Sequence, residues 1–299
     1  MQRLSLQLAA PGLLLAVLLL AGCGGQKREK STAAVSEEAS VLSGEVVTAD
    51  RVQKTIQLQQ PGLPGRLPAG LQTFRLLPAD AEIVTTGQAW RGETHQRNGD
   101  WWLEHLWPDD ATTLRLLTAT GQALAQDTMI RGRAAYREIG ELIPDFTLLD
   151  QNARLVSANQ WRGRQVVLNF IFTRCQVATM CPAATRRMQQ LQQAAKAAGR
   201  NDVTFVTITF DPAYDSPGVL RAYATERGID LGNFSLLTGP ETTIQHLLTQ
   251  FGVLRTIADG TIKHTATTVL IDRQGHIAYR AEGSAWTVEE FLERLVPPP

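Results

Sequence analysis

Hydrophobic and polar residues alternate along residues 42–108, and this pattern predicts a small β domain. The runs GEVVTAD and KTIQLQ flank Asp50 and Arg51, which indicates a hairpin. LQTFRLLP and DWWLEHLWP add further strands, and Pro61-Gly62 and Pro64-Gly65 mark a loop. Several short strands separated by turn signals predict a small OB-like β-barrel over residues 41–110.

The next segment, residues 111–138, is interpreted as a connector between two domains. Within it, residues 114–117 are expected to form a last strand, and the charged run IRGRAAYRE is expected to form a short helix.

From residue 139 onward the pattern alternates between strands and helices. VVLNFIF and VTFVTITF are apolar, β-branched runs, and the second is suited to burial on both faces. The long helix between them should start near Pro182 and stop at Gly199, while Ser216 and Pro217 should begin the next helix. A hairpin and a helix over residues 288–295 complete the order. The predicted fold class is α/β, with a thioredoxin-like domain over residues 139–299 behind the barrel.

The first residues have the pattern of a targeting segment. Arg3 precedes a short apolar run at residues 8–20, which is too short for a comfortable membrane span and suits a signal peptide. The ending LAGC resembles a bacterial lipobox, in which Cys23 is lipidated. The alternative is an ordinary signal peptide with an incidental Cys23. We interpret residues 1–23 as the signal and residues 24–40 as a flexible tether, so the protein should be exported and lipid-anchored to a bacterial membrane, facing the periplasm or the cell exterior.

Charge and cysteine content narrow the function. The chain has 29 basic and 29 acidic residues, and no basic run follows the signal, so nothing indicates nucleic-acid binding. One of its three cysteines is Cys23, which leaves Cys175 and Cys181 as a pair in an oxidising compartment.

The cysteine pair lies where a strand passes into a helix. Two cysteines six positions apart in one helix would point about 120° apart, so Cys175 should lie in the loop and Cys181 at the helix start. Pro182 supports this placement, because proline is favoured in the first helical turn. The helix N-terminus should favour a thiolate at Cys181. The pair can serve as metal ligands, as a redox pair, or as a plain disulfide.

Residues 139–296 resemble the Sco/SenC family of copper-handling, thioredoxin-fold proteins. The resemblance rests on PDFTLLDQNARLV, VVLNFIFTRC, Cys181-Pro182, TFDPAYDSPGVLRAYATERG and KHTATTVLIDRQGHIAYR. It implies copper binding by Cys175, Cys181 and His264, and assistance in building the copper site of cytochrome c oxidase, or thiol-disulfide work on that oxidase. Five residues separate the cysteines here, whereas the family usually has three, and Gln176 replaces the usual proline.

Copper binding would involve mainly Cu(I), with Cu(II) as the second state, because thiolates and imidazole are soft and borderline ligands. The implied partners are the oxidase subunit that carries the copper site, other copper chaperones, and periplasmic thiol reductants. Asp211 is either a residue that supports the metal site or a turn former before Pro212. Met180 is either a thioether donor or a packing residue. His246 and His276 are interpreted as structural or exposed.

The predicted barrel resembles periplasmic copper-binding OB-like domains in GEVVTAD, IQLQ, PGLPGRLPAG and GDWWLEHL. It lacks the histidine and methionine ligands of that family, because the corresponding positions are Gln60, Leu67, Gly70 and Gln72. His95 and His105 are interpreted as solvated or core residues, and the tryptophans of this segment as packing residues. We therefore expect this domain to hold no copper itself, but to extend or shield the copper domain or to contact a partner.

Two classes of function remain open, together with a structural alternative. The first is a metallochaperone that binds and delivers copper. The second is a thiol-disulfide oxidoreductase that uses Cys175 and Cys181, which form a disulfide when oxidised. The structural alternative is a lipoprotein domain stabilised by that disulfide. His264 discriminates between the first two classes, because a dithiol exchanger does not need an imidazole ligand.

The LAGC sequence predicts a lipid on Cys23. Mass spectrometry of the mature N-terminus should find a diacylglyceryl-modified cysteine as the first residue. A mature protein that retains an unmodified Cys23 would contradict the lipobox assignment.

Overall fold

The computed structural model describes residues 40–132, 135–258 and 261–297. The predicted signal peptide, Cys23 and the predicted tether up to residue 39 lie outside these ranges. Within the described part of the chain, no helix has the length and apolar character needed to cross a membrane.

The first domain is a closed five-stranded barrel, as the alternating pattern predicted. Around the barrel the strands follow the order β1, β2, β3, β5, β4, and β4 closes on β1 through antiparallel pairs from Ser40–Thr94 to Glu45–Ala89. Alternate residues face a core that includes Val46, Leu58 and Phe74. The elements are β1 (Ser40–Asp50), β2 (Thr55–Gln60), β3 (Gly70–Arg75), α1 (Pro78–Ile83), β4 (Ala89–Arg97) and β5 (Asp100–Pro108).

Two barrel elements were not predicted, the short helix α1 and the strand β4. β4 was overlooked although it alternates, with Trp90 and Thr94 buried. Gln60, one of the positions that depart from the copper-binding barrels, uses its amide to shape the loop. Its Nε2 donates to Pro68 O at 2.8 Å, and its Oε1 accepts from the Gly62 N–H.

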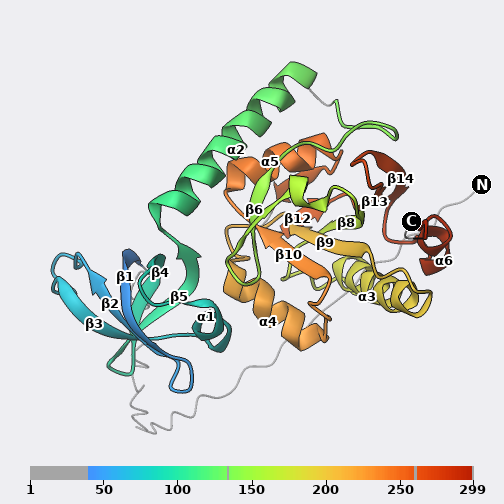
Figure 1. Cartoon of the computed structure of the whole chain (residues 1–299). Helices are drawn as coiled ribbons and strands as arrows, with labels where there is room; N and C mark the ends of the chain where they lie inside the picture. The colour runs from blue at the N-terminus through green and yellow to red at the C-terminus, as the bar shows by residue number, and fades with distance from the viewer. Residues whose placement is uncertain (1–39, 133–134, 259–260, 298–299) are drawn as a thin grey trace, which may run out of the picture. The chain divides into compact units, whose positions relative to one another are not determined.

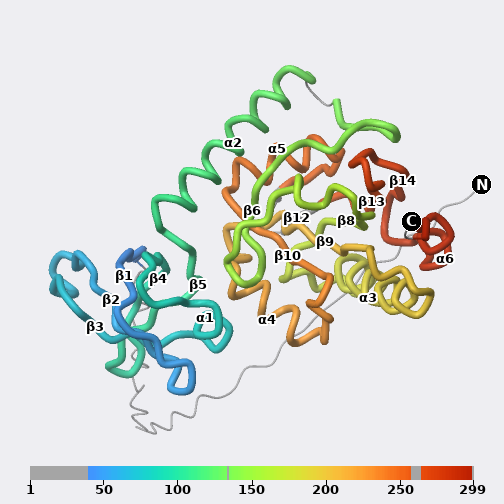
Figure 2. Tube along the Cα trace, viewed as in Figure 1, coloured from blue at the N-terminus to red at the C-terminus, as the bar shows by residue number. Residues whose placement is uncertain are grey.

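Helix α2 (Ala111–Arg131) occupies most of the expected connector, so the prediction of a strand at residues 114–117 was wrong. Asp110 caps the helix by accepting from Thr113 N at 3.0 Å, and the buried positions Leu117 and Leu124 follow a helical spacing. The short helix expected over IRGRAAYRE is also wrong, because α2 ends at Arg131 and Gly132 has a φ of 97°. Figure 2 shows the chain passing from β5 directly into α2.

The second domain is built on a seven-stranded sheet in the order β14, β13, β8, β9, β10, β6, β7 (Figure 1). Its strands are β6 (Thr147–Asp150), β7 (Leu155–Ser157), β8 (Gln165–Ile171), β9 (Val203–Thr209), β10 (Phe234–Thr238), β13 (Thr267–Ile271) and β14 (Ile277–Glu282). Its helices, besides the 3₁₀ turn η1 (Ala158–Trp161), are α3 (Cys181–Ala197), α4 (Pro217–Arg227), α5 (Glu241–Gln250) and α6 (Val288–Leu292).

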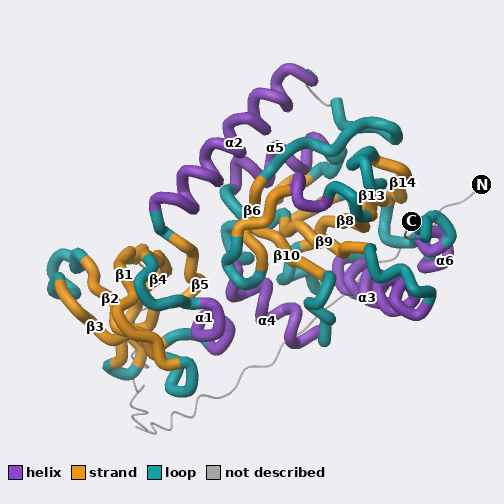
Figure 3. Tube along the Cα trace, in the orientation of Figure 1, coloured by secondary structure: helices purple, strands orange, loops and turns teal. Residues whose placement is uncertain are grey.

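Parallel pairing of β8, β9 and β10 forms the centre of this sheet. Every residue of β8 is buried, which agrees with its apolar sequence and its two covered faces. Helices α3 and α4 make the crossovers between the parallel strands, and the strands lie between these helices on one side and α2 and α5 on the other (Figure 3). The α/β thioredoxin-like prediction is therefore confirmed.

The predicted helix boundaries in this domain are close to those observed. Helix α3 begins at Cys181, with Pro182 in its first turn, and Gly199 follows its end with a φ of 73°. Ser216 caps α4 by accepting from Val219 N at 3.4 Å. Helix α6 is shorter than expected and ends at Leu292. The antiparallel pair formed by β11 (Arg255–Ala258) and β12 (Thr261–His264) was not predicted.

Helix α4 approaches α1 of the barrel closely at Gly218. A Cβ atom at this position would lie 2.0 Å from Oδ1 of Asp80, so the approach requires a glycine. Arg221 of α4 also pairs with Glu82, with its Nε 2.5 Å from the carboxylate. Burial raises the pKa of Asp80 to about 6, although its carboxylate accepts from the backbone N–H groups of Leu106 and His105.

Gly252→Ala should destabilise the protein more than Gly199→Ala. Both glycines follow helix ends in the left-handed region, where any L-residue costs about 1–2 kcal/mol. A Cβ at Gly252 would also lie 2.8 Å from Nη2 of Arg280 and 2.9 Å from Cγ of Tyr136, whereas one at Gly199 meets nothing within 4 Å. Urea unfolding of both variants measures the difference, and equal losses would contradict the packing argument.

Candidate metal centre

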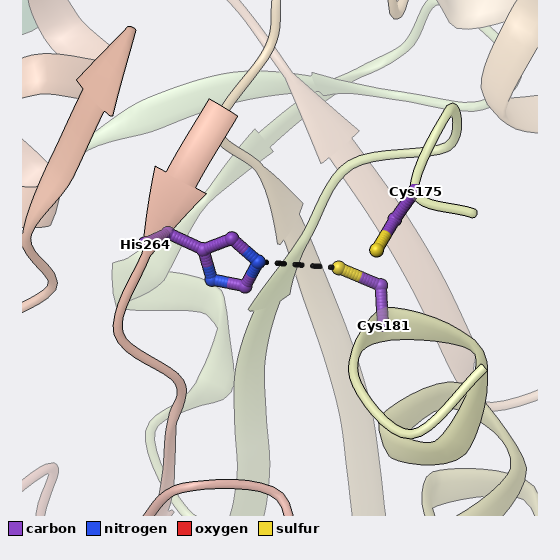
Figure 4. Close-up of side chains that lie close together, drawn as sticks. All are labelled: Cys175, Cys181 and His264. Atoms are coloured by element: carbon purple, nitrogen blue, oxygen red, sulfur yellow. Dashed lines mark hydrogen bonds between the residues drawn. The ribbon is translucent and has the colours of Figure 1, made fainter. Parts of the chain in front are cut away.

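The two cysteines lie where β8 passes into α3. Cys175 lies in the loop that follows β8, and Cys181 is the first residue of α3, as the spacing argument predicted. Both are free cysteines, with 8% and 3% of their surface exposed. In Figure 4 their sulfur atoms point toward one another from the loop and the helix end.

His264 completes the group from the opposite side. It is the last residue of β12, and its Nε2 lies 3.7 Å from Sγ of Cys181 (Figure 4). The potential ligand atoms of Cys175, Cys181 and His264 all lie within 4.8 Å of one another. The structure therefore brings together the three residues that the family resemblance indicated.

The orientation of the His264 ring is set by its neighbours. Nδ1 lies 2.9 Å from the carbonyl oxygen of Thr265, which can only accept a hydrogen bond, so Nδ1 carries the proton and Nε2 keeps its lone pair toward Cys181. Phe210 packs with its ring centroid 4.3 Å from that of His264, and Phe172 meets the imidazole edge-on at 5.8 Å. These contacts fix the tautomer that a metal ligand needs.

Burial dominates the electrostatics of the group. It raises the pKa of Cys181 above the usual thiol range, and the neighbouring Cys175 adds to the effect. The expectation that the helix N-terminus would favour a thiolate at Cys181 was therefore wrong, because desolvation outweighs the dipole. Burial also lowers the pKa of His264. Both shifts favour the neutral forms of the Cys181 thiol and the His264 imidazole when no metal is bound.

Local contacts hold the loop between the cysteines. The hydroxyl of Ser284 donates to the carbonyl oxygen of Thr179 at 2.8 Å, and the N–H of Met180 donates to Val177 O at 2.9 Å. Met180 precedes α3 and packs against the hydrophobic core, while the Val177 side chain is exposed.

Two aspartates approach the cysteine loop from the segment that follows β9. Asp211 is buried, and its carboxylate accepts from Nε and Nη2 of Arg174 at 3.1 and 2.6 Å. Asp215 is fully buried and accepts from Thr173 and Thr209. Burial raises the pKa of Asp215 to about 6, and these hydrogen bonds oppose the shift. Asp215 was not predicted as a site residue. The only available signal was its position in DPAYDSP, one residue before the helix cap.

The remaining histidines lie on other elements. His95 contacts Arg97 on β4, and Nδ1 of His105 lies 3.4 Å from the Glu93 carboxylate. His246 is half-buried on α5. His276 contacts Asp272 in the turn between β13 and β14. Among the tryptophans, Trp90 belongs to the barrel core, whereas Trp102 and Trp107 lie beneath the guanidinium groups of Arg97 and Arg91.

Two thiols and one imidazole can support two kinds of chemistry. After deprotonation they form a soft three-donor set, which suits a trigonal Cu(I) ion better than zinc, whose structural sites use four ligands. The thiols can alternatively oxidise to a disulfide, which would remove both thiolates from any metal site. Either process must remove the proton that burial favours on the Cys181 sulfur.

A thioredoxin-like sheet with this group at the end of a central strand defines a thioredoxin-fold protein with a dithiol or soft-metal site. The sequence pattern described as SCO1/SenC matches residues 134–296, which is more than half of the chain. The chain belongs to the SCO1/SenC family.

Two relatives agree with this assignment by sequence identity, and a solved structure is also similar to part of the chain. An SCO2-like protein of Rickettsia typhi is 30% identical over 164 residues, which cover 52% of this chain and 76% of the relative. A protein of Stutzerimonas stutzeri, provisionally named as copper-binding, is 30% identical over 160 residues, which cover 52% and 75%. The crystal structure of a SCO1/SenC family lipoprotein from Bacillus anthracis aligns with 54% of this chain and 97% of its own, at 28% identity and a TM-score of 0.49.

The lowered pKa of His264 predicts a pH dependence of stability for the reduced, metal-free protein. Below the ordinary value of 6.5, the unfolded state takes up a proton that the folded state resists. The free energy of unfolding should therefore fall as the pH falls from 6.5 toward the lower pKa of the folded state. Urea unfolding across this range should show a smaller fall for His264→Gln. An identical pH dependence in both proteins would contradict the assignment.

Proposed function

We propose that this protein carries one copper ion on Cys175, Cys181 and His264 and delivers it to the copper site of a cytochrome c oxidase subunit. The observation that carries the proposal is the approach of the three donor atoms to within 4.8 Å of one another. Cu(I) is the carried state, because two thiolates and an imidazole are soft and borderline donors. Cu(II) is the second state that the set can hold.

Family membership and the provisional copper-binding name of the Stutzerimonas relative both support copper as the cargo. The ligand chemistry supports it independently, since the three donors grouped among the described residues are fewer than the four of a closed zinc site. In this proposal Asp211 has an indirect role at the site, because its carboxylate holds Arg174, the residue next to Cys175.

The position of His264 supports delivery as well as binding. His264 lies on a two-stranded sheet that is separate from the seven-stranded sheet, whose strand β8 leads into the cysteine loop. An imidazole on such a hairpin can withdraw without breaking the hydrogen bonds of the main sheet. The ion would then be left on two thiolates and open to a partner's ligands.

The setting that we propose is a bacterial membrane, with the protein facing the periplasm or the cell exterior. Lipidated Cys23 would anchor the chain, and residues 24–40 would act as a tether. The domains follow as a barrel over 41–110, a connector over 111–138 and the copper domain over 139–299. The barrel would shield the copper domain or contact a partner. Other copper chaperones would load the site with copper, and periplasmic thiol reductants would keep its two thiols reduced.

A second candidate function is a membrane-anchored thiol-disulfide oxidoreductase that acts on the oxidase or on other exported cysteine proteins. It is favoured by the two free thiols in a thioredoxin-like fold, with sulfur atoms less than 5 Å apart. This activity needs Cys175 and Cys181 but has no need of the His264 imidazole.

Redox state should control copper binding. A disulfide between Cys175 and Cys181 removes both thiolates, so the reduced protein should bind one Cu(I) and the oxidised protein none. Metal analysis after Cu(I) loading under argon measures this directly. Equal copper content in both redox states would exclude the proposed ligand set.

The three ligands should differ in what their loss does. Cys175→Ser and Cys181→Ser should each abolish stable Cu(I) binding, because one thiolate and one imidazole make a poor Cu(I) site. His264→Ala should weaken binding by more than about tenfold while leaving the dithiol able to oxidise. His276→Ala, on the turn between β13 and β14, is the matched control and should change neither property.

The same variants separate the two functions. If His264→Ala leaves copper affinity and oxidase assembly intact while either serine variant destroys function, copper delivery is excluded. The dithiol oxidoreductase would then be the better account.

A further inference from the structure

A fully buried carboxylate lies behind the cysteine loop, where the copper function does not use it directly. Asp215 is 0% exposed and follows β9 in the segment that leads to α4. Its carboxylate accepts from the N–H of Thr173 at 3.1 Å, from the Thr173 hydroxyl, and from the Thr209 hydroxyl at 2.5 Å. Each of these donors is neutral. Burying a carboxylate among neutral donors is costly, so a function is needed to account for it.

Support of α4 does not account for Asp215. The adjacent Ser216 caps that helix, since its Oγ accepts from Val219 N. The Asp215 carboxylate instead contacts the segment after β8. It holds both the backbone and the side chain of Thr173, which fixes the orientation of that residue two positions before Cys175.

A second carboxylate from the same segment, that of Asp211, holds Arg174, the residue between Thr173 and Cys175. Asp211 accepts from two nitrogens of Arg174, whose guanidinium carbon also lies 4.3 Å from the ring centre of Tyr214. Both residues ahead of Cys175 are therefore held by carboxylates of residues 211–215.

The two carboxylates are themselves joined. The Thr209 hydroxyl accepts from the Asp211 N–H at 3.0 Å and donates to Asp215. In addition, the Asp215 N–H donates to the carbonyl oxygen of Asp211 at 2.9 Å. Because every bond in this set is directional, the segment after β9 is a stiff support for the loop after β8.

We propose that Asp215 is a positioning residue for Cys175, holding Thr173 so that the Cys175 sulfur meets Cys181 and His264. The inference rests on the proposed copper site for its main measurement. Loss of the carboxylate frees the Thr173 N–H and hydroxyl, and the loop then samples positions in which the Cys175 sulfur is out of reach. Cys181 and His264, which lie on other elements, keep their places.

The experiment compares Cu(I) affinity, measured by competition with a chromophoric Cu(I) chelator, in the reduced full-length protein and its variants. Asp215→Ala should lower affinity by more than about tenfold, the range found when support of a metal ligand is lost. Asp215→Asn keeps one carbonyl acceptor for the Thr173 N–H. Its Cu(I) affinity should lie between those of the unaltered protein and Asp215→Ala. Thr173→Val removes only the hydroxyl bond and should also weaken binding, whereas Thr173→Ser should restore it.

Asp150→Ala is the matched control for a general loss of stability. Asp150 is also a buried carboxylate and is the last residue of β6, away from the cysteine loop. It accepts from the Asn152 and Arg154 N–H groups at 2.8 Å. Urea unfolding gives the free energy of unfolding of each variant. Cu(I) affinities are then compared between variants whose free energies of unfolding are similar. If Asp215→Ala folds poorly, Asp215→Asn and Thr173→Val decide the question.

The positioning role is overturned if Asp215→Ala or Thr173→Val binds Cu(I) as tightly as the unaltered protein. It is also overturned if Asp150→Ala, at similar stability, loses as much affinity. If the unaltered protein binds no Cu(I), the copper function fails, and the equilibrium of the Cys175–Cys181 disulfide with a thiol buffer tests the positioning separately. Asp215→Ala should then change that equilibrium constant by at least about tenfold, or about 30 mV, and Asp150→Ala should leave it unchanged.

Discussion

The candidate metal site depends on one constraint. The side chains of Cys181 and His264 must lie in contact, although the two residues are 83 positions apart in the chain. The parallel pairing of β8 with β9 meets half of this requirement. It places the ends of both strands at one edge of the sheet, so that Cys175, Cys181 and the aromatic ring of Phe210 lie together. The antiparallel pairing of β13 with β8 meets the other half, because β13 follows His264 by only two residues.

Burial gives this group its chemical character. The same desolvation that raises the pKa of Cys181 lowers the pKa of His264, so both effects favour a neutral site in the absence of metal. A bound cation would change this balance, because its charge offsets the thiolate charge that burial disfavours at Cys181. The stiffness needed to hold such a site comes from the polar contacts of Asp211 and Asp215 and from the aromatic rings around His264.

The barrel and the copper domain have separate hydrophobic cores, yet they are not joined by a loose linker. Helix α2 follows the barrel after two residues and contributes Leu124 to the core of the second domain. Glycine at position 218 lets α4 approach α1, and the Arg221–Glu82 pair lies beside this contact. The barrel is therefore joined to the second domain by a helix that packs into the second core and by the contact between α1 and α4.

The sequence alone determined most of the second domain. The apolar strands β8 and β9, the proline at the start of α3 and the Ser216 cap are local signals, and each was found where the pattern placed it. The prediction from periodicity was wrong at α2. The run LRLL is typical of a short strand, whereas the burial of Leu117 and Leu124 follows the spacing of a helix. The barrel was predicted as a class of fold, but its strand β4 and helix α1 were overlooked.

Only the tertiary structure decided the chemistry of the site. The sequence predicted the places of Cys175 and Cys181, but His264 rested on family resemblance, since nothing local to it indicates which residues it will meet. The predicted protonation state of Cys181 was wrong. The sequence indicates where a helix begins, and hence its dipole, but the desolvation of the sulfur depends on every element packed around it. Asp215 was overlooked for the same reason. Its hydrogen bonds to Thr173 span 42 positions, and such contacts exist only once parallel strands bring their ends together.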